Sequence, residues 1–191
     1  MAPILGIYAS QISGHLWAPS GAYDSIATIN VGSGGSSSVT FSSIPSGYTH
    51  LQIRMLARTN RADNLDYVNM QFNGDTGSNY AWHLLVGTGS AVSAGAGTSE
   101  TSIRHIYPPA ANIASNIFGS FITDVLDYSN TNKNKTARYL GAFDANGLGY
   151  AVLGSGLWMS TSAVTSITLT PISGNSFTQY SQFALFGIKG N

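Results

Sequence analysis

The sequence contains no cysteine and very few charged residues. Among its 191 residues, Lys plus Arg number 8 and Asp plus Glu number 8, so the formal net charge is zero and charged residues make up 8% of the chain, against roughly 25% in an average soluble domain. The absence of cysteine excludes disulfides and thiolate metal sites. The scarcity of Lys and Arg argues against nucleic-acid and membrane partners, because both are bound through clustered positive charge.

An export signal and a membrane-spanning segment are also lacking. Residues 1–7 are largely apolar but carry no basic region, and Ser10, Gln11 and His15 interrupt the apolar run. A membrane helix needs roughly 20 apolar residues in a row, and a secretion signal begins with positive charge. We therefore expect a protein that is made without an export signal and has no membrane partner.

Helical periodicity is scarce, whereas alternation of apolar and polar residues recurs along the chain. Within residues 48–58, the apolar residues Leu51, Ile53 and Met55 alternate with polar ones, which is the pattern of a strand with one buried and one wet face. The predicted strands cover Ser25–Val31, Ser38–Ile44, Tyr48–Arg58, Leu65–Asn73, Tyr80–Val86, Ser102–Tyr107, Ile117–Tyr128, Thr136–Phe143, Gly149–Met159, Val164–Pro171 and Gln182–Ile188.

Many short strands without crossover helices favour an all-β fold. We expect a jelly-roll-like antiparallel β-sandwich with an extended N-terminal arm, and an up-and-down barrel stays open as an alternative. The predicted organisation is an arm over residues 1–24 and a single β-sandwich domain over residues 25–191.

Turn-forming residues predict how some of these strands are joined. Residues 32–36 predict a hairpin between the first two strands, and Asn146-Gly147 predicts another, because both residue types tolerate positive φ. The Gly/Ala/Ser stretch over residues 87–98 has side chains too small to bury much surface, so it predicts a loop without a role in the core. The segments 117–128 and 182–188 are apolar on both registers, which predicts strands that are central or covered on both faces.

Residues 1–24 break the alternation and are predicted to form the arm. Their apolar side chains are scattered among Gly, Ser and Pro and would be poorly solvated if free. We expect the arm to lie across a neighbouring subunit, burying surface worth about 25 cal/mol per Å²; the alternative is that it folds back onto its own sandwich. The predicted partner-binding residues are Ile4, Leu5, Ile7, Tyr8, Ile12, Leu16 and Trp17.

No residue pattern predicts catalysis. The four histidines stand outside any catalytic signature, and no nucleophile elbow or phosphate-binding loop occurs. The carboxylate pairs Asp63/Asp66 and Asp124/Asp127 are each three residues apart, so in a strand they point to opposite faces instead of converging. We expect a protein that is not an enzyme, with no catalytic residues and no cofactor.

Metal ligands and clustered cations are equally scarce. Residues 73–79 offer oxygen ligands at alternate positions but lack the terminal glutamate of a calcium loop, so a tight hairpin is the better explanation and no metal site is predicted. Arg54, Arg58 and Arg61 form the only local cationic cluster. They predict either a solvated strand face or intermolecular salt bridges.

Several segments spread over nearly the whole chain are similar to a known group of proteins. They are Pro3–His15, Tyr23–Val31, Phe41–Arg54, Gln71–Asp75 and Phe183–Lys189. In these segments the sequence resembles small β-rich structural proteins of tailed-bacteriophage virions. The resemblance implies a capsid cement or decoration protein or a tail-tip or fibre component, homotrimeric, assembled in the host cytoplasm and located in the virion.

Three hypotheses follow from the residues and the resemblance together. The first is a non-enzymatic cement protein that bridges neighbouring major capsid subunits and stabilises the head. The second is a receptor-binding tail-tip or fibre protein, in which residues 87–98 and 130–135, with Tyr107, Tyr128 and Trp158, hold host surface glycans. The third, a cytosolic sugar-active enzyme on a jelly roll, needs converging carboxylates that the strand parity does not supply.

Overall fold

The structure, a computed structural model, describes residues 22–190, which form strands and one 3-10 turn over Ile172–Gly174. Within this range, no helix has the length and hydropathy needed to cross a membrane. The strands are β1 (Tyr23–Asn30), β2 (Val39–Phe41), β3 (His50–Ala57), β4 (Val68–Phe72), β5 (Tyr80–Gly87), β6 (Val92–Glu100), β7 (Ile103–Ile106), β8 (Gly119–Leu126), β9 (Lys135–Asp144), β10 (Gly149–Trp158), β11 (Ile167–Pro171) and β12 (Gln182–Ile188).

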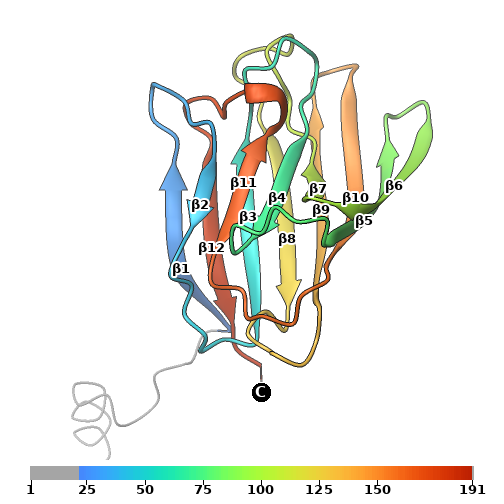
Figure 1. Ribbon diagram of the computed structural model, residues 1–191. Helices are drawn as coiled ribbons and strands as arrows, with labels where there is room; N and C mark the ends of the chain where they lie inside the picture. Colours follow the sequence, from blue (N-terminus) through green and yellow to red (C-terminus); the bar gives the residue numbers. More distant parts are fainter. Residues whose placement is uncertain (1–21, 191) are drawn as a thin grey trace, which may run out of the picture.

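Two antiparallel sheets pack face to face (Figure 1). The larger sheet has eight strands in the order β1-β12-β3-β8-β9-β10-β5-β6, and the smaller has four in the order β2-β11-β4-β7. The predicted all-β, jelly-roll-like antiparallel sandwich is confirmed. The alternative of a single up-and-down barrel is wrong, because the strands form two separate sheets. The sheets differ in width, so the β5–β6 end of the larger sheet extends past the smaller one (Figure 1).

Most strands lie where the alternation predicts them. β12 has the predicted bounds, and β3 lies within the predicted segment 48–58. β1 begins at Tyr23, two residues before the predicted start of the sandwich at residue 25. Asn146 and Gly147, between β9 and β10, both have positive φ, at 54° and 116°, as their residue types predict.

The prediction of a loop over residues 87–98 is wrong. β5 runs to Gly87, and β6 returns antiparallel along it from Val92. The small residues of β6 make room for the larger side chains of β5, because a Cβ on Gly97 would lie 2.6 Å from the indole nitrogen of Trp82. A strand without large side chains is therefore stabilised by the rings of its neighbour and by the backbone ladder.

The predicted hairpin between the first two strands is also wrong. β1 pairs with β12 in the larger sheet, whereas β2 pairs with β11 in the smaller one. Residues 32–36 therefore cross from one sheet to the other instead of turning back within one. Alternation marks a strand and its two faces, but it carries no information about which strand will be its partner.

Aromatic rings fill the space between the sheets. Phe72 of the smaller sheet packs against Trp158 of the larger sheet, with ring centres 5.6 Å apart. Phe177 packs edge-on against Phe183, with ring centres 4.7 Å apart. Buried aromatic rings contribute most to such a core because each removes a large apolar surface from water.

Inward-facing glycines make room for these rings. A Cβ on Gly141 would overlap the ring of Phe121, and a Cβ on Gly154 would overlap the ring of Tyr139. Both glycines lie in central strands of the larger sheet, where a residue without a side chain normally weakens the strand. Here the neighbouring ring occupies the space that a side chain would otherwise fill.

Candidate functional site

The larger sheet has an outer face that stays exposed in the part of the chain that the structure describes. The smaller sheet packs on the opposite, inner face (Figure 1). Because side chains alternate along a strand, neighbouring residues point to different faces. In β9, Tyr139 is buried whereas Leu140, the next residue, is 59% exposed.

The strand register brings apolar side chains from five strands into one line across this outer face. Ile122 lies opposite Leu140, and Leu140 lies opposite Leu153. Leu153 in turn lies opposite Leu85, and Leu85 opposite Ala94. Ile122, Leu153 and Leu85 are 42%, 56% and 47% exposed. We call these five residues the apolar row.

Small side chains border one side of the apolar row. The register places the next line of outward residues at Ser120, Ala142, Ala151, Gly87 and Val92. The larger side chains of the apolar row therefore rise above this border, and Val92, which is 73% exposed, extends the apolar surface at the β6 edge.

Polar side chains border the other side. This polar row consists of Gln52, Asp124, Arg138, Ser155 and His83. Asp124 accepts hydrogen bonds from Gln52 Nε2 and from Arg138 Nε, each at 2.9 Å. The Asp124 carboxylate is thus already bound by two neighbours and is not a free acid beside the apolar row.

This arrangement is suited to binding by burial. Covering a half-exposed leucine contributes about 1 kcal/mol, and neighbouring side chains add to this when one partner covers them together. Contiguous exposed apolar surface of this kind marks interaction sites in soluble proteins, whereas single exposed apolar residues do not. The outer face therefore provides a candidate interaction surface with a polar row along one side.

His105 is a buried titratable group with a strongly lowered pKa. It is fully buried between the sheets, and burial lowers its pKa to about 3. Its Nε2 forms a short hydrogen bond with the Thr123 hydroxyl, and its ring packs edge-on to Tyr139 at 5.1 Å. A neutral imidazole enclosed in this way is a core residue and has no access to a ligand.

Asp66 and Arg61 form a second buried polar group near the start of β4. Asp66 is fully buried, and desolvation raises its pKa although it accepts a hydrogen bond from the Tyr67 backbone N–H at 2.8 Å. Arg61 Nη1 lies 3.7 Å from Asp66 Oδ1, and Arg61 Nη2 lies 3.2 Å from Asp63 Oδ2. These contacts fix the loop that precedes β4.

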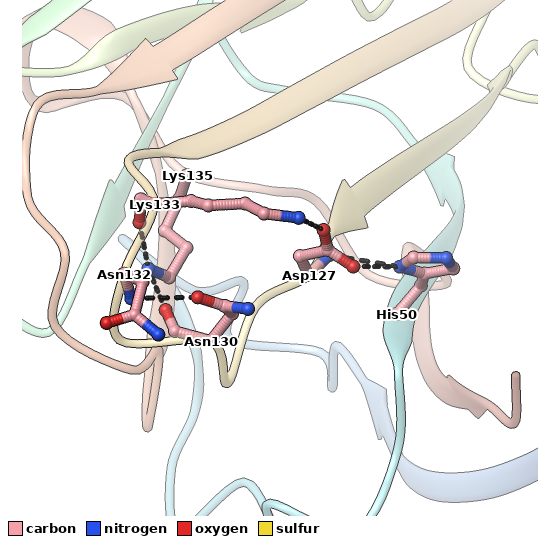
Figure 2. A network of polar contacts seen from close by, with 6 residues as sticks. All are labelled: His50, Asp127, Asn130, Asn132, Lys133 and Lys135. Atoms are coloured by element: carbon pink, nitrogen blue, oxygen red, sulfur yellow. Dashed lines mark hydrogen bonds and ion pairs between the residues drawn. The ribbon is translucent and has the colours of Figure 1, made fainter.

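The turn between β8 and β9 carries a polar network (Figure 2). The Asp127 backbone N–H donates to His50 Nδ1 at 3.0 Å, so this ring nitrogen is an acceptor. Lys133 Nζ donates to Asp127 Oδ2 at 2.7 Å, and this hydrogen bond lowers the pKa of the Asp127 carboxyl. The network ties the turn to the start of β3.

Lys135 anchors the same turn from inside. Its side chain is fully buried, and its Nζ donates to the carbonyl oxygens of Asn130 and Lys133 at 2.6 and 2.7 Å (Figure 2). It also donates to the Thr161 carbonyl at 3.1 Å. Desolvation lowers the pKa of the Lys135 amine. Two of the acceptors lie in the turn and the third follows β10, so all three ammonium protons are bound within the fold and the residue has a structural role.

The residues that sequence reasoning placed in the arm lie outside the described residues. They are Ile4, Leu5, Ile7, Tyr8, Ile12, Leu16 and Trp17. The interpretation of the arm as a partner-binding segment therefore stays a prediction.

Two aromatic residues assigned to a glycan site are buried instead. Tyr128 is fully buried and its hydroxyl donates to the Pro45 carbonyl, while Trp158 is buried and its indole N–H donates to Asp75 Oδ2 at 2.7 Å. Both rings belong to the core and cannot stack on a ligand. Tyr107 is also largely buried, although part of its surface lines a pocket beside β7.

The arginine cluster does not form one face. Arg54 points outward, with its guanidinium 5.6 Å from the ring centre of Tyr23 and 5.4 Å from that of Phe186. Arg58 is buried beyond the end of β3, where it donates to the Ile113 carbonyl at 2.6 Å. The interpretation as a shared solvated strand face is wrong because the strand ends before Arg58.

Asp124 and Asp127 do not converge, whereas Asp63 and Asp66 both contact the guanidinium of Arg61, which neutralises them. Asp124 is held in the polar row, whereas Asp127 lies in the turn and binds Lys133. Asp66 is buried, whereas half of the Asp63 side chain is exposed. Among residues 22–190, no group of three or more His, Asp or Glu side chains could hold a metal ion.

The apolar row is the feature that sequence reasoning missed. Its signal is visible in the segment 117–128, which is apolar on both registers and predicts a strand that is central or covered on both faces. β8 is central in its sheet, but Ile122 on its outer face is exposed. The segment is apolar on both faces, as the sequence indicates, but nothing in the described part of the chain covers the outer face.

Comparison with known proteins gives little further information. No protein-family model matches the chain, and no curated protein matches it. Among solved structures, the chain is similar to a galectin from Caenorhabditis elegans, with 8% sequence identity and a TM-score of 0.32, over 85% of this chain and 96% of the galectin.

Proposed function

We propose that this chain is a non-enzymatic structural protein of a bacteriophage virion, a cement or decoration protein that bridges neighbouring major capsid subunits and stabilises the head. The observation that carries the proposal is the apolar row on the outer face of the larger sheet. A surface of this kind suits a protein that is covered by neighbours in an assembly.

The two predicted contact regions have separate roles in this proposal. The apolar row packs against a second copy of the chain within a homotrimer, and the arm reaches the major capsid protein. The neutral overall charge supports dense packing of copies, because it gives them no net repulsion. The protein is then located in the virion and needs no cofactor, nucleic acid or membrane.

Charged substitutions in the apolar row test the proposal. The double variant Leu140→Glu/Leu153→Glu places two carboxylates in the row, and Thr136→Glu/Ser155→Glu places two on the same strands outside it. We expect the first variant to fold, to lose self-association in light scattering and to be absent from particles, while the second assembles normally. Equal incorporation of both variants, or equal loss, contradicts the role of the row.

The arm is tested by deletion. Removing residues 2–20 is expected to leave a folded sandwich that no longer incorporates into particles, measured by the ratio of this protein to capsid protein after purification. Particles without the protein should also lose resistance to heat. Unchanged incorporation of the shortened chain contradicts the assignment of the arm.

A second candidate function is a receptor-binding tail-tip or fibre protein that adsorbs to host surface glycans. One observation favours it: a pocket lined by aromatic rings opens beside the β5–β6 hairpin. Adsorption of purified protein to host cells distinguishes this function from cementing, which predicts none.

A further inference from the structure

The unequal width of the two sheets leaves a pocket at one edge of the sandwich. β7 is the edge strand of the smaller sheet, and the β5–β6 hairpin extends past it (Figure 1). A pocket of about 280 Å³ lies in this region, lined from β5, β6, β7, β10 and the segment before β4. We call it the edge pocket. Its volume is at the lower end of the range for small-molecule sites, about 300–1,000 Å³.

Arg104 of β7 is the cation of the edge pocket. Its guanidinium carbon lies 4.9 Å from the ring centre of Tyr67 and 5.0 Å from that of Trp82. Stacking on aromatic rings uses the flat faces of a guanidinium and leaves its N–H edge for a planar acceptor. A carboxylate matches this edge with two parallel hydrogen bonds.

Arg104 differs from the neighbouring arginine in having no acidic partner within the described part of the chain. Arg61, which lies 5.5 Å from the same Tyr67 ring, is paired with Asp63 and Asp66. No ion pair within 4 Å joins Arg104 to a carboxylate in residues 22–190, although Glu100 ends the neighbouring β6. No carboxylate of the described residues therefore forms an ion pair with Arg104.

The rest of the lining combines rings with hydroxyl groups. Tyr150 is partly exposed on the β10 side, and the hydroxyl of Tyr107 lies near Arg104. Thr88 and Ser93 line the side formed by the β5–β6 hairpin. Rings offer a flat apolar surface to the C–H face of a sugar, and hydroxyls can exchange hydrogen bonds with sugar hydroxyls.

We propose that the edge pocket binds an acidic monosaccharide unit, with the sugar carboxylate on Arg104 and the sugar ring against Tyr150. The pocket has room for one ring, and Arg104, which has no ion pair within the described residues, matches a single carboxylate. The proposal deepens the receptor-binding candidate by naming the class of glycan, and it does not depend on the cement function.

Titration of the full chain with acidic and neutral sugars tests the proposal. The probes are D-glucuronate and N-acetylneuraminate, with D-glucose as the neutral counterpart of glucuronate, and heat of binding is the readout. We expect at least one acidic sugar to bind roughly tenfold or more tightly than glucose, because the hydrogen bonds to a charged group are lost without the carboxylate.

Two arginine variants locate the site. Arg104→Gln is expected to weaken binding of the acidic sugar by roughly tenfold or more. Arg138→Gln removes the same charge from the outer face of the larger sheet and is expected to leave binding unchanged. Thermal unfolding of each variant checks that the variant is folded. The comparison of acidic sugars with glucose uses the unaltered chain, so its result does not depend on the folding of a variant.

Three results overturn the proposal: no binding of either acidic sugar, equal binding of glucose, or full binding by a folded Arg104→Gln variant. Binding of an acidic sugar without adsorption to host cells distinguishes the sugar site from the receptor-binding function. That result supports the edge pocket and contradicts the receptor-binding function.

Discussion

The inner and outer faces of the larger sheet belong to the same strands but differ in how their side chains pack. On the inner face of β8 and β9, Phe121 and Tyr139 fill space that glycines on neighbouring strands leave open. On the outer face, Ile122 and Leu140 lie in a row that nothing in the described part of the chain covers. The inner face is shaped to complement neighbours within the fold, whereas the outer face is apolar without any such complement.

This difference separates folding from binding. Inner residues are required for the stability of the isolated chain, because truncating them leaves cavities between the sheets. Outer residues contribute little to the isolated chain, because they stay in contact with water after folding. Apolar residues on such a face are available for a contact outside the fold.

The largest expected effect compares adjacent residues on β8. Phe121→Ala is expected to reduce the free energy of unfolding by about 3–5 kcal/mol, because a buried ring is lost and a cavity remains. Ile122→Ala is expected to reduce it by less than about 1 kcal/mol. Urea unfolding of both variants provides the measurement. Similar losses for the two would mean that the outer face is also part of the stabilising core.

The buried histidine adds a pH dependence to the inner face. Because the folded pKa of His105, about 3, lies below the unfolded value of 6.5, only the unfolded chain gains this proton as the pH falls below 6.5. Stability is therefore lost toward acid at about 1.4 kcal/mol per pH unit, or about 2 kcal/mol at pH 5.

Denaturant unfolding between pH 7 and pH 4 measures this loss. His105→Gln is expected to remove that part of the pH dependence, while His83→Gln, which replaces an exposed histidine in the polar row, keeps it. If the His105→Gln variant loses stability toward acid as steeply as the unaltered chain, the histidine is not the group responsible.

Glycines test the complementarity of the inner face directly. Gly141→Ala is expected to cost about 1–3 kcal/mol, because the added Cβ overlaps the Phe121 ring and the core must shift. Gly87→Ala, on the outer face with no atom within 4 Å of the added Cβ, is expected to change stability by less than about 0.5 kcal/mol. Thermal unfolding distinguishes these outcomes, and a neutral Gly141→Ala variant argues against tight packing.

The smallest expected effect concerns the polar row. Arg138→Gln removes an exposed ion pair with Asp124 and is expected to cost about 0–1 kcal/mol, because water and salt screen such pairs. Asp124 keeps its hydrogen bond from Gln52. Unfolding at low and high salt measures the change, and a loss well above this range would show that the row stabilises the fold.

Local patterns predicted the strands well and their partners poorly. The bounds of β12 and the positive φ of Asn146 and Gly147 follow from residue types over a few positions. The pairing of β1 with β12 joins opposite ends of the chain, and nothing local in residues 32–36 indicates it. The composition of β6 does not predict a strand, because its glycines are explained by side chains that the local pattern does not reveal, Trp82 and Leu84 of β5 among them.

The sequence predicts that residues of the candidate surface are apolar, but it does not predict that their side chains are exposed. Alternation shows that the segment 117–128 has two apolar faces, yet only the arrangement of the sheets shows which face is covered. Tyr128 and Trp158 are expected in a glycan site at the surface, but their polar atoms bond to Pro45 and Asp75 within the fold. Such contacts join residues far apart in the sequence, so no short window reveals them.

The most direct test of the central claim, that the outer face is an assembly surface, is cryo-electron microscopy of the virion in which we propose that this protein is located. The account predicts copies of this protein at lattice positions on the head, with Leu140 and Leu153 covered by a second copy. A virion without the protein, or one in which both leucines face solvent, would contradict it.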